Sequence, residues 1–151
     1  MQGLNNMFYP ENPISRAEVC TMIVRARNLP WNPSYSNPFI DLPTGHSHYQ
    51  AVLICYHLGF VSGIGNRFYP DNHVLRRDAA KMLCRGFEIS TYQVMTRPWS
   101  DYMPEDDNFE YAYTLKMKGV LAGYLDGSFG PNANLTRAEA AKIFSNLLIL
   151  N

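Results

Sequence analysis

Apolar residues recur at helical spacing in three similar segments of the chain. The last segment follows the i, i+3, i+4, i+7, i+8 pattern, which predicts a helix with one buried face. Its apolar residues are Ala140, Ile143, Phe144, Leu147 and Leu148. The equivalent residues of the earlier segments are Val19, Met22, Ile23 and Ala26, and then Ala79, Met82, Leu83 and Phe87. No alternating pattern of useful length predicts a strand, so the sequence indicates a mainly α protein.

The three segments belong to an internal repeat. The stretches "FYPENPISRAEVCTMIVRARNL", "FYPDNHVLRRDAAKMLCRGFEI" and "FGPNANLTRAEAAKIFSNLLIL" superimpose, starting at Phe8, Phe68 and Phe129, so the spacings are 60 and 61 residues. A repeat of this length is typical of architectures built from stacked supersecondary units.

Each complete copy is predicted to form a helix, a tight loop and a second helix. The upstream halves align as well, with Asp41 matching Asp101 and Gly63 matching Gly123. The first copy retains only its second half, so we expect an incomplete first repeat. The predicted divisions are the second half of repeat 1 at 1–29, a linker at 30–38, repeat 2 at 39–89, a linker at 90–98 and repeat 3 at 99–151.

The second helices begin with a capping motif in two of the three copies. Thr136 and Glu139 form a capping box, in which a hydroxyl and a carboxylate satisfy free N–H groups at the helix start. Ser15 and Glu18 repeat this pattern. Such a cap contributes about 1 kcal/mol, so helix stability alone explains these four residues.

An arginine occupies the first turn of all three second helices, and capping does not explain it. These residues are Arg16, Arg76 and Arg137, and the helix macrodipole disfavours a cation at this position. One interpretation is that each arginine lies along the surface and pairs with a nearby acid. The other, which we favour, is that each guanidinium and the unpaired first-turn N–H groups form a carboxylate site. Three such sites would bind a repetitive ligand with avidity.

Composition and charge narrow the classes of function. Thirteen Lys and Arg residues balance thirteen Asp and Glu residues, and no basic run occurs, so we expect no nucleic-acid partner. No apolar run approaches the roughly 20 residues of a membrane span, and no export signal is visible in "MQGLNNMFYP". We expect Cys20, Cys55 and Cys84 to be buried apolar residues rather than zinc ligands or a disulfide framework.

Other residue patterns predict neither catalysis nor a metal or cofactor site. His46 and His48 lack paired acidic ligands, and the acids of 104–111 precede a helix start, where negative charge is stabilising. Two tryptophans could stack on sugar rings. Trp31 lies in a linker and is the better candidate for an exposed contact, whereas Trp99 fits core packing better, because both complete copies have an aromatic residue there.

The repeated motifs resemble the S-layer homology (SLH) module. The resemblance rests on the opening "WSDY", the Gly-Val-Leu-x-Gly segment, "DGSFGPN" and "LTRAE", and it covers nearly the whole chain except the linkers. It implies tandem helix-loop-helix repeats packed as a pseudo-threefold helical bundle.

The resemblance also implies a non-catalytic anchoring function in a bacterial cell wall or S-layer, outside the cell. The implied ligand is secondary cell wall polysaccharide or another peptidoglycan-linked glycan, often with a pyruvyl carboxylate, bound in grooves between modules. The motif arginine is the family's main ligand contact, which here corresponds to Arg137 and Arg16. We extend the expected glycan site to these residues: Arg76, Trp31, Trp99, Gly63 and Gly123.

The middle copy departs from the family pattern. Its motif reads "VLRRD", so Leu75 cannot cap the helix and Asp78 is a shorter substitute for glutamate. The second cation, Arg77 beside Arg76, predicts a groove of weaker or altered specificity. A rival interpretation is a structural or oligomerisation module, in which a second copy or a partner segment completes repeat 1.

Overall fold

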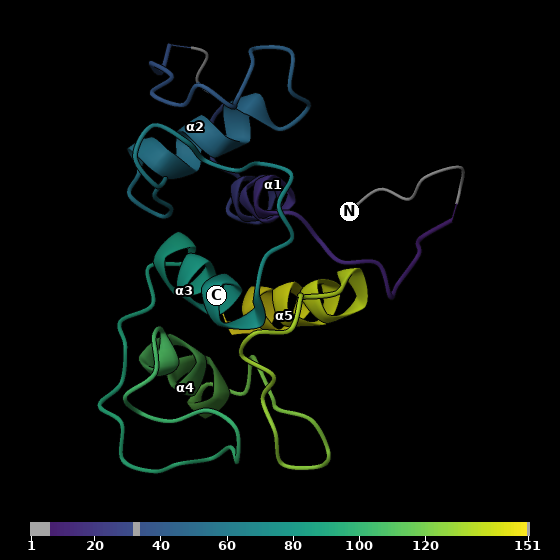
Figure 1. Ribbon diagram of the computed structural model, residues 1–151, viewed down its shortest axis with the longest axis vertical. Helices are drawn as coiled ribbons and strands as arrows, with labels where there is room; N and C mark the ends of the chain where they lie inside the picture. Colours follow the sequence, from purple (N-terminus) through teal and green to yellow (C-terminus); the bar gives the residue numbers. More distant parts are fainter. Residues whose placement is uncertain (1–6, 32–33, 151) are drawn as a thin grey trace.

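The computed structural model describes residues 7–31 and 34–150. This part of the chain forms helices and no strand, which confirms the mainly α class. The helices are α1 (Arg16–Ala26), α2 (Tyr49–His57), α3 (Arg76–Gly86), α4 (Phe109–Met117) and α5 (Arg137–Leu150). In Figure 1, α1, α3 and α5 lie in the middle of an elongated molecule, with α2 at one end and α4 at the other.

Local capping determines where α1 and α5 begin. The Ser15 hydroxyl accepts a hydrogen bond from the Glu18 N–H at 3.2 Å, and the Glu18 carboxylate accepts one from the Ser15 N–H at 2.8 Å. Thr136 and Glu139 form the same reciprocal pair. Leu75 provides no side-chain cap for α3. These observations confirm both predicted capping boxes and the missing cap of the middle repeat.

A ring of backbone hydrogen bonds joins the three repeats at the centre of the molecule. The Ile14 N–H donates to the Leu135 carbonyl at 2.9 Å, the Leu135 N–H donates to the Val74 carbonyl at 2.9 Å, and the Val74 N–H donates to the Ile14 carbonyl at 3.0 Å. All three residues are buried. The pseudo-threefold arrangement implied by the resemblance is therefore present in the backbone itself.

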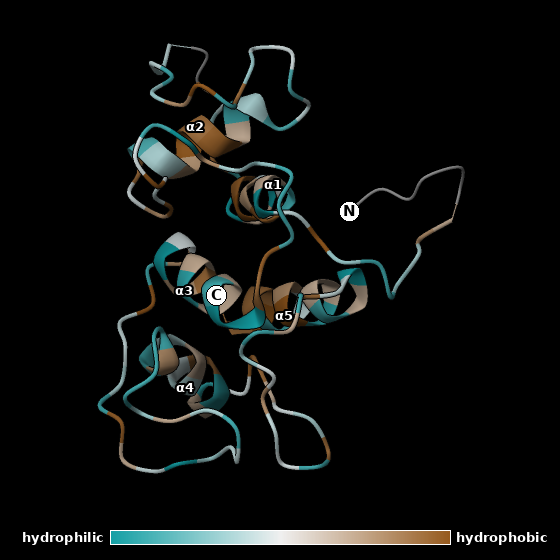
Figure 2. Cartoon of the chain, viewed as in Figure 1, coloured by the Kyte–Doolittle hydropathy of each residue, from teal (hydrophilic) through white to brown (hydrophobic). Residues whose placement is uncertain are grey.

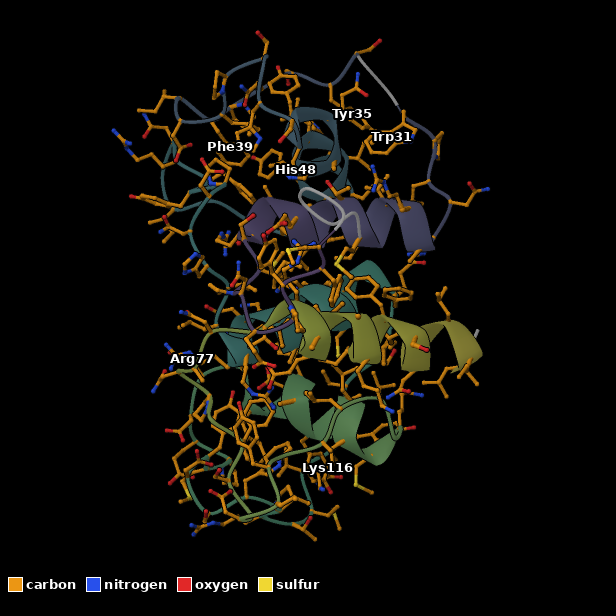
Figure 3. All side chains as sticks on the ribbon, turned by 90° about the vertical axis from the view of Figure 1, so that its right-hand side faces the viewer. Trp31, Tyr35, Phe39, His48, Arg77 and Lys116 are labelled. Carbon is orange, nitrogen blue, oxygen red and sulfur yellow. The ribbon has the colours of Figure 1, made fainter. Side chains whose placement is uncertain are left out.

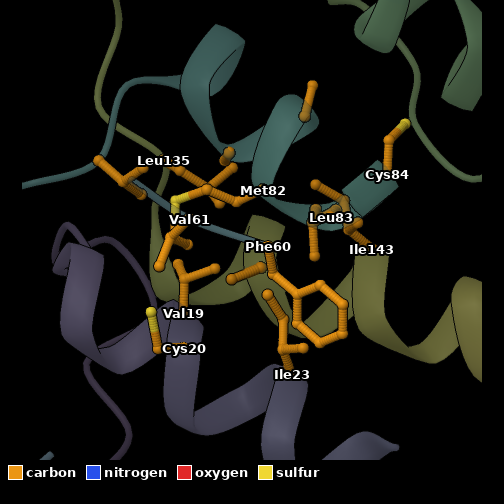
Figure 4. Close-up of a cluster of buried hydrophobic side chains, with 14 of the residues drawn as sticks. Val19, Cys20, Ile23, Phe60, Val61, Met82, Leu83, Cys84, Leu135 and Ile143 are labelled. Carbon is orange, nitrogen blue, oxygen red and sulfur yellow. The ribbon is translucent and has the colours of Figure 1, made fainter. Parts of the chain in front are cut away.

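The hydrophobic core is continuous through the repeats. Figure 4 shows Ile23 of α1, Leu83 of α3 and Ile143 of α5 around Phe60 and Val61, which lie in the loop after α2. Figure 2 shows apolar segments along the helices, for example in the middle of α2 and in α5, and many of their side chains are buried in this core. The cysteines expected in the core are all free and buried. At each end, one first helix packs against the second helix of the preceding repeat, α2 on α1 and α4 on α3.

Candidate functional site

The three motif arginines extend from their own helix to the loop of a neighbouring repeat. The Arg16 Nε donates to the Phe68 carbonyl at 3.1 Å, and its Nη2 donates to the Ser62 carbonyl at 3.0 Å. Its guanidinium also lies 4.7 Å from the centre of the Phe68 ring. The equivalent Nε bonds are those of Arg76 to the Phe129 carbonyl and of Arg137 to the Phe8 carbonyl. Each arginine therefore connects two repeats.

Two of the arginines also pair with a capping-box glutamate. Arg76 is only 4% exposed, and its Nη1 lies 2.7 Å from Glu139 Oε1. Arg137 Nη1 lies 3.1 Å from Glu18 Oε1. In each glutamate, Oε2 caps its own helix while Oε1 binds the arginine of the neighbouring repeat. The expected pairing with a nearby acid therefore holds for Arg76 and Arg137, but Arg76 is buried rather than lying along the surface.

The first-turn N–H groups do not contribute to an anion site. The N–H groups of Arg16, Arg76 and Arg137 donate at 2.9 Å to the carbonyls of Asn72, Ala133 and Asn12, respectively. The expectation that these groups are unpaired is wrong, because loops of the neighbouring repeats approach the helix ends and supply acceptors. Any anion site at these positions must be formed by side chains.

The structure places most of the expected glycan-site residues around two equivalent clefts. The Arg76 groove has a volume of about 760 Å³ and includes Arg76, Lys116, Gly123, Tyr124, Glu139 and Lys142. The Arg16 groove has a volume of about 280 Å³ and includes Arg16, Ser62, Gly63, Asp78, Lys81 and Arg85. Both grooves contain more cations than carboxylates.

Sequence reasoning missed the lysines that line these grooves. Lys81 on α3 and Lys142 on α5 occupy the same register position, five residues after the motif arginine. Lys116 of α4 adds a further cation to the Arg76 groove; Figure 3 labels it near one end of the molecule. The register was visible in the sequence, because the two lysines coincide when the repeats are superimposed.

Gly63 and Gly123 line the grooves, and aromatic side chains approach their backbone so closely that a side chain at either position would collide with them. A Cβ at Gly123 would lie 2.6 Å from Trp99 Nε1, and a Cβ at Gly63 would lie 2.4 Å from the Phe39 ring. Trp99 is 3% exposed and packs 4.6 Å from the Phe129 ring, so it presents no free face for stacking on a sugar. Core packing, the alternative given for Trp99, accounts for its position.

Trp31 lies in a separate pocket beside α1. It is 50% exposed and shares this pocket with Glu18, Thr21 and His48, and Figure 3 shows Trp31 and His48 on this side of the molecule. The His48 Nδ1 lies 2.8 Å from the Thr21 hydroxyl. Burial is the main cause that lowers the pKa of His48 below its usual value.

The aspartate that opens each complete repeat positions the loop that binds the arginine. The Asp41 carboxylate accepts hydrogen bonds from the N–H groups of Phe68 and Tyr69, both at 2.8 Å. Asp101 does the same for Phe129 and Gly130. Burial alone would raise the pKa of the Asp41 carboxyl, but these hydrogen bonds outweigh it and the pKa lies below its usual value.

Comparison with known proteins gives the same repeat pattern. A model of the S-layer homology domain matches residues 1–20, 38–80 and 101–141. The chain belongs to the S-layer homology domain family. Members of this family form cell-surface anchoring modules, so this chain is an anchoring module of the bacterial cell wall or surface. No helix in the described parts of the chain is long and apolar enough to cross a membrane.

The relatives of this S-layer homology chain are much longer proteins. It is 28% identical to an S-layer protein of Bacillus thuringiensis subsp. finitimus, covering 92% of this chain and 17% of the relative. It is 26% identical to a cellulosome-anchoring protein of Acetivibrio thermocellus, covering 94% and 33%, respectively. An amylopullulanase of Thermoanaerobacterium thermosulfurigenes is 27% identical over 98% of this chain and 8% of the enzyme. The chain thus spans a small part of each relative.

Proposed function

We propose that this module attaches a larger protein to the cell wall by binding an acidic glycan in its grooves, without catalysis of its own. The main support is that the Arg76 and Arg16 grooves present cations at equivalent positions, Lys142 and Lys81. A relative named as a cellulosome-anchoring protein supports an anchoring function. The proposed ligand is secondary cell wall polysaccharide carrying carboxylate groups, such as pyruvyl ketals.

Two cationic grooves on one module suit a repetitive polymer. A hydrogen-bonded contact between a charged group and a carboxylate contributes roughly 1.5–3 kcal/mol. One such contact gives weak binding, whereas two grooves that contact one polymer chain raise the overall affinity through effective concentration. Trp31, which is exposed beside α1, adds a surface suited to stacking on a sugar ring.

The test is a pull-down of the chain on purified cell wall polymer. We expect a Lys81→Ala/Lys142→Ala variant to bind at least about tenfold more weakly, because each lysine supplies a charged contact to the glycan. These lysines are better probes than the motif arginines, since the arginines also hold the repeats together. Lys118→Ala is the matched control, because Lys118 lies outside both grooves and its ammonium contacts the Tyr92 ring.

Removal of the acidic substituent from the polymer should weaken binding by the wild-type chain to a similar extent. Equal binding of the native and the stripped polymer would refute the carboxylate proposal. Loss of binding in Lys118→Ala as severe as in the double variant would show that general charge, rather than the grooves, determines attachment.

A second candidate role is assembly with another helical segment, and α5 carries the observation that favours it. In the helix pairs α1–α2 and α3–α4, a cysteine thiol hydrogen-bonds to the backbone of the packed helix. The Cys55 thiol of α2 donates to the Cys20 carbonyl of α1, and the Cys84 thiol of α3 donates to the Tyr111 carbonyl of α4. The residue of α5 equivalent to Cys84 is Ser145, which is exposed, and no helix of the described residues packs there as α4 packs on α3. Light scattering tests this role, and a strict monomer at high concentration would contradict completion by a second copy.

A further inference from the structure

The middle repeat lacks a carboxylate position that the other two repeats fill. Glu139 and Glu18 each reach across a repeat boundary to the Nη1 of an arginine. By the order of the repeats, the residue that would bind Arg16 in this way is Asp78. Its side chain is one methylene shorter, and its Oδ1 accepts a hydrogen bond from the Asn108 amide at 2.9 Å. The substitution in "VLRRD" therefore alters the environment of Arg16, not that of Arg76.

Arg16 is held in the same orientation as its equivalents. Its Nε and Nη2 donate to the carbonyls of Phe68 and Ser62, just as the Nε and Nη2 of Arg76 donate to Phe129 and Ala122. In Arg76 the remaining nitrogen, Nη1, binds Glu139. Within 7–31 and 34–150, Arg16 makes no ion pair. Its Nη1 is thus fixed in place beside the Arg16 groove without a carboxylate.

The charges around this nitrogen favour an anion. Lys81 and Arg85 follow Asp78 by three and seven residues on α3, so they share its helix face and line the same groove. Asp78 is the one acidic residue among the lining residues of this groove. Arg16, Lys81 and Arg85 against this one carboxylate give the groove a net positive charge. The Arg76 groove has the same balance of cations and acids, but there the carboxylate of Glu139 pairs with the motif arginine itself.

We propose that the Arg16 groove is the principal carboxylate site of the module, and that Asp78 is the residue that makes it available. The carboxylate of an acidic sugar takes the position next to Arg16 Nη1 that Glu139 and Glu18 occupy in the other repeats. These glutamates show that a carboxylate fits this position, which favours a carboxylate over a phosphate. The inference rests on the proposed glycan binding and assigns its acidic group to one groove.

The decisive variant is Asp78→Glu, which keeps the charge and supplies the missing methylene. The new glutamate should bind Arg16 and exclude the carboxylate of the ligand. We expect it to weaken binding of methyl glucuronide at least about tenfold, measured by NMR titration of the Arg16 side chain. Methyl glucoside, the neutral counterpart, should bind neither protein detectably, and glucose phosphate should bind the wild type more weakly than the glucuronide.

Asp71→Glu is the matched control, because Asp71 is 85% exposed and its carboxylate pairs with His46 on the surface. It should bind methyl glucuronide as the wild type does. Thermal unfolding without ligand provides a second readout, since Asp78→Glu should raise the Tm by forming the third arginine–glutamate pair. An unchanged Tm together with unchanged glucuronide binding would overturn the inference, as would tighter binding of glucose phosphate than of glucuronide.

Binding to cell wall polymer and to glucuronide distinguishes glycan binding itself from its assignment to the Arg16 groove. If the wild type binds cell wall polymer and Asp78→Glu binds it equally well, glycan binding stands and its assignment to the Arg16 groove is overturned. If the wild type binds neither polymer nor glucuronide, the proposed function fails, and with it this inference, even where Asp78→Glu raises the Tm.

Discussion

At the scale of single residues, the capping glutamates perform two tasks with two oxygens. One oxygen of Glu139 satisfies the N–H of Thr136 at the start of α5, and the other neutralises Arg76, which is almost completely buried. A buried guanidinium without a partner is strongly destabilising. The sequence motif that begins a helix is therefore also the contact that joins it to its neighbour.

Replacement of Glu139 by glutamine separates these two tasks. Gln can still accept the hydrogen bond of a capping box, but it leaves Arg76 without a countercharge. We expect Glu139→Gln to lower the free energy of unfolding by about 2–4 kcal/mol. Glu18→Gln, whose partner Arg137 is more exposed, should cost less, about 1–2 kcal/mol. Urea denaturation measures both, and a larger cost for Glu18→Gln would contradict the explanation.

Asp41 makes the free energy of unfolding fall when the pH becomes acidic. Its pKa is lower in the folded chain than in the unfolded chain, so the carboxylate stabilises the fold above its unfolded pKa of about 4. This contribution is lost as the pH falls from about 4 through the lower folded value. Asp41→Asn should therefore destabilise the protein at neutral pH and flatten this part of the curve of Tm against pH. An identical acid limb in the variant would show that other carboxyls determine it.

At the scale of helices and loops, the sequence predicted the features that are determined by residues close together in the chain. Capping boxes, apolar faces and the missing cap at Leu75 follow from residues three or four positions apart. The structure confirms the capping boxes and the missing cap, and it buries most of the predicted apolar faces. Leu148 is the correction, because it was expected on the buried face of α5 and is 54% exposed. The acceptors of the first-turn N–H groups could not be predicted in this way. Asn72 lies 56 residues from Arg16, and the contact exists only because the repeats close around an axis.

The same limit applies to the candidate site. The arginines could be identified because the helix macrodipole disfavours a cation in the first turn. Their partners could not be identified, because they lie in other repeats. Superposition of the repeats could have identified Lys81 and Lys142, which share a register position. It could not reveal that Asp78 affects Arg16, because that pairing crosses a repeat boundary.

The loop glycines offer a test of packing at this scale. Gly123→Ala would place a methyl group within 2.4 Å of the Ser128 carbonyl and against the Trp99 ring, so we expect a loss of about 1–3 kcal/mol. Gly45→Ala is the matched control, since nothing lies within 4 Å of a Cβ there. Its Tm should change little. Equal stability of the two variants, measured by calorimetry, would refute the packing explanation for Gly123.

At the scale of the whole molecule, the backbone ring of Ile14, Val74 and Leu135 joins all three repeats. A bond of this ring cannot open without separating two repeats. Solenoid repeat proteins differ, because each of their repeats contacts only its neighbours in sequence. Here the first and last repeats are also in contact, through the Ile14–Leu135 hydrogen bond.

Hydrogen exchange can test whether the ring defines one cooperative unit. We expect the amides of Ile14, Val74 and Leu135 to exchange only through global unfolding, with protection within about 1 kcal/mol of the free energy from denaturant titration. Faster exchange at one of the three amides would show that its repeat opens independently of the others.

The contact between Arg137 and the Phe8 carbonyl spans 129 positions of the chain, and this has a kinetic consequence. Helical bundles usually fold fast because their contacts are local, whereas contacts of long sequence separation slow the search for the native state. Here the entropy of closing nearly the whole chain must be lost before the last interface forms. While α5 is still inside the ribosome, the contact of Arg137 with Phe8 cannot form. We therefore expect the three repeats to close around their axis only after α5 has emerged.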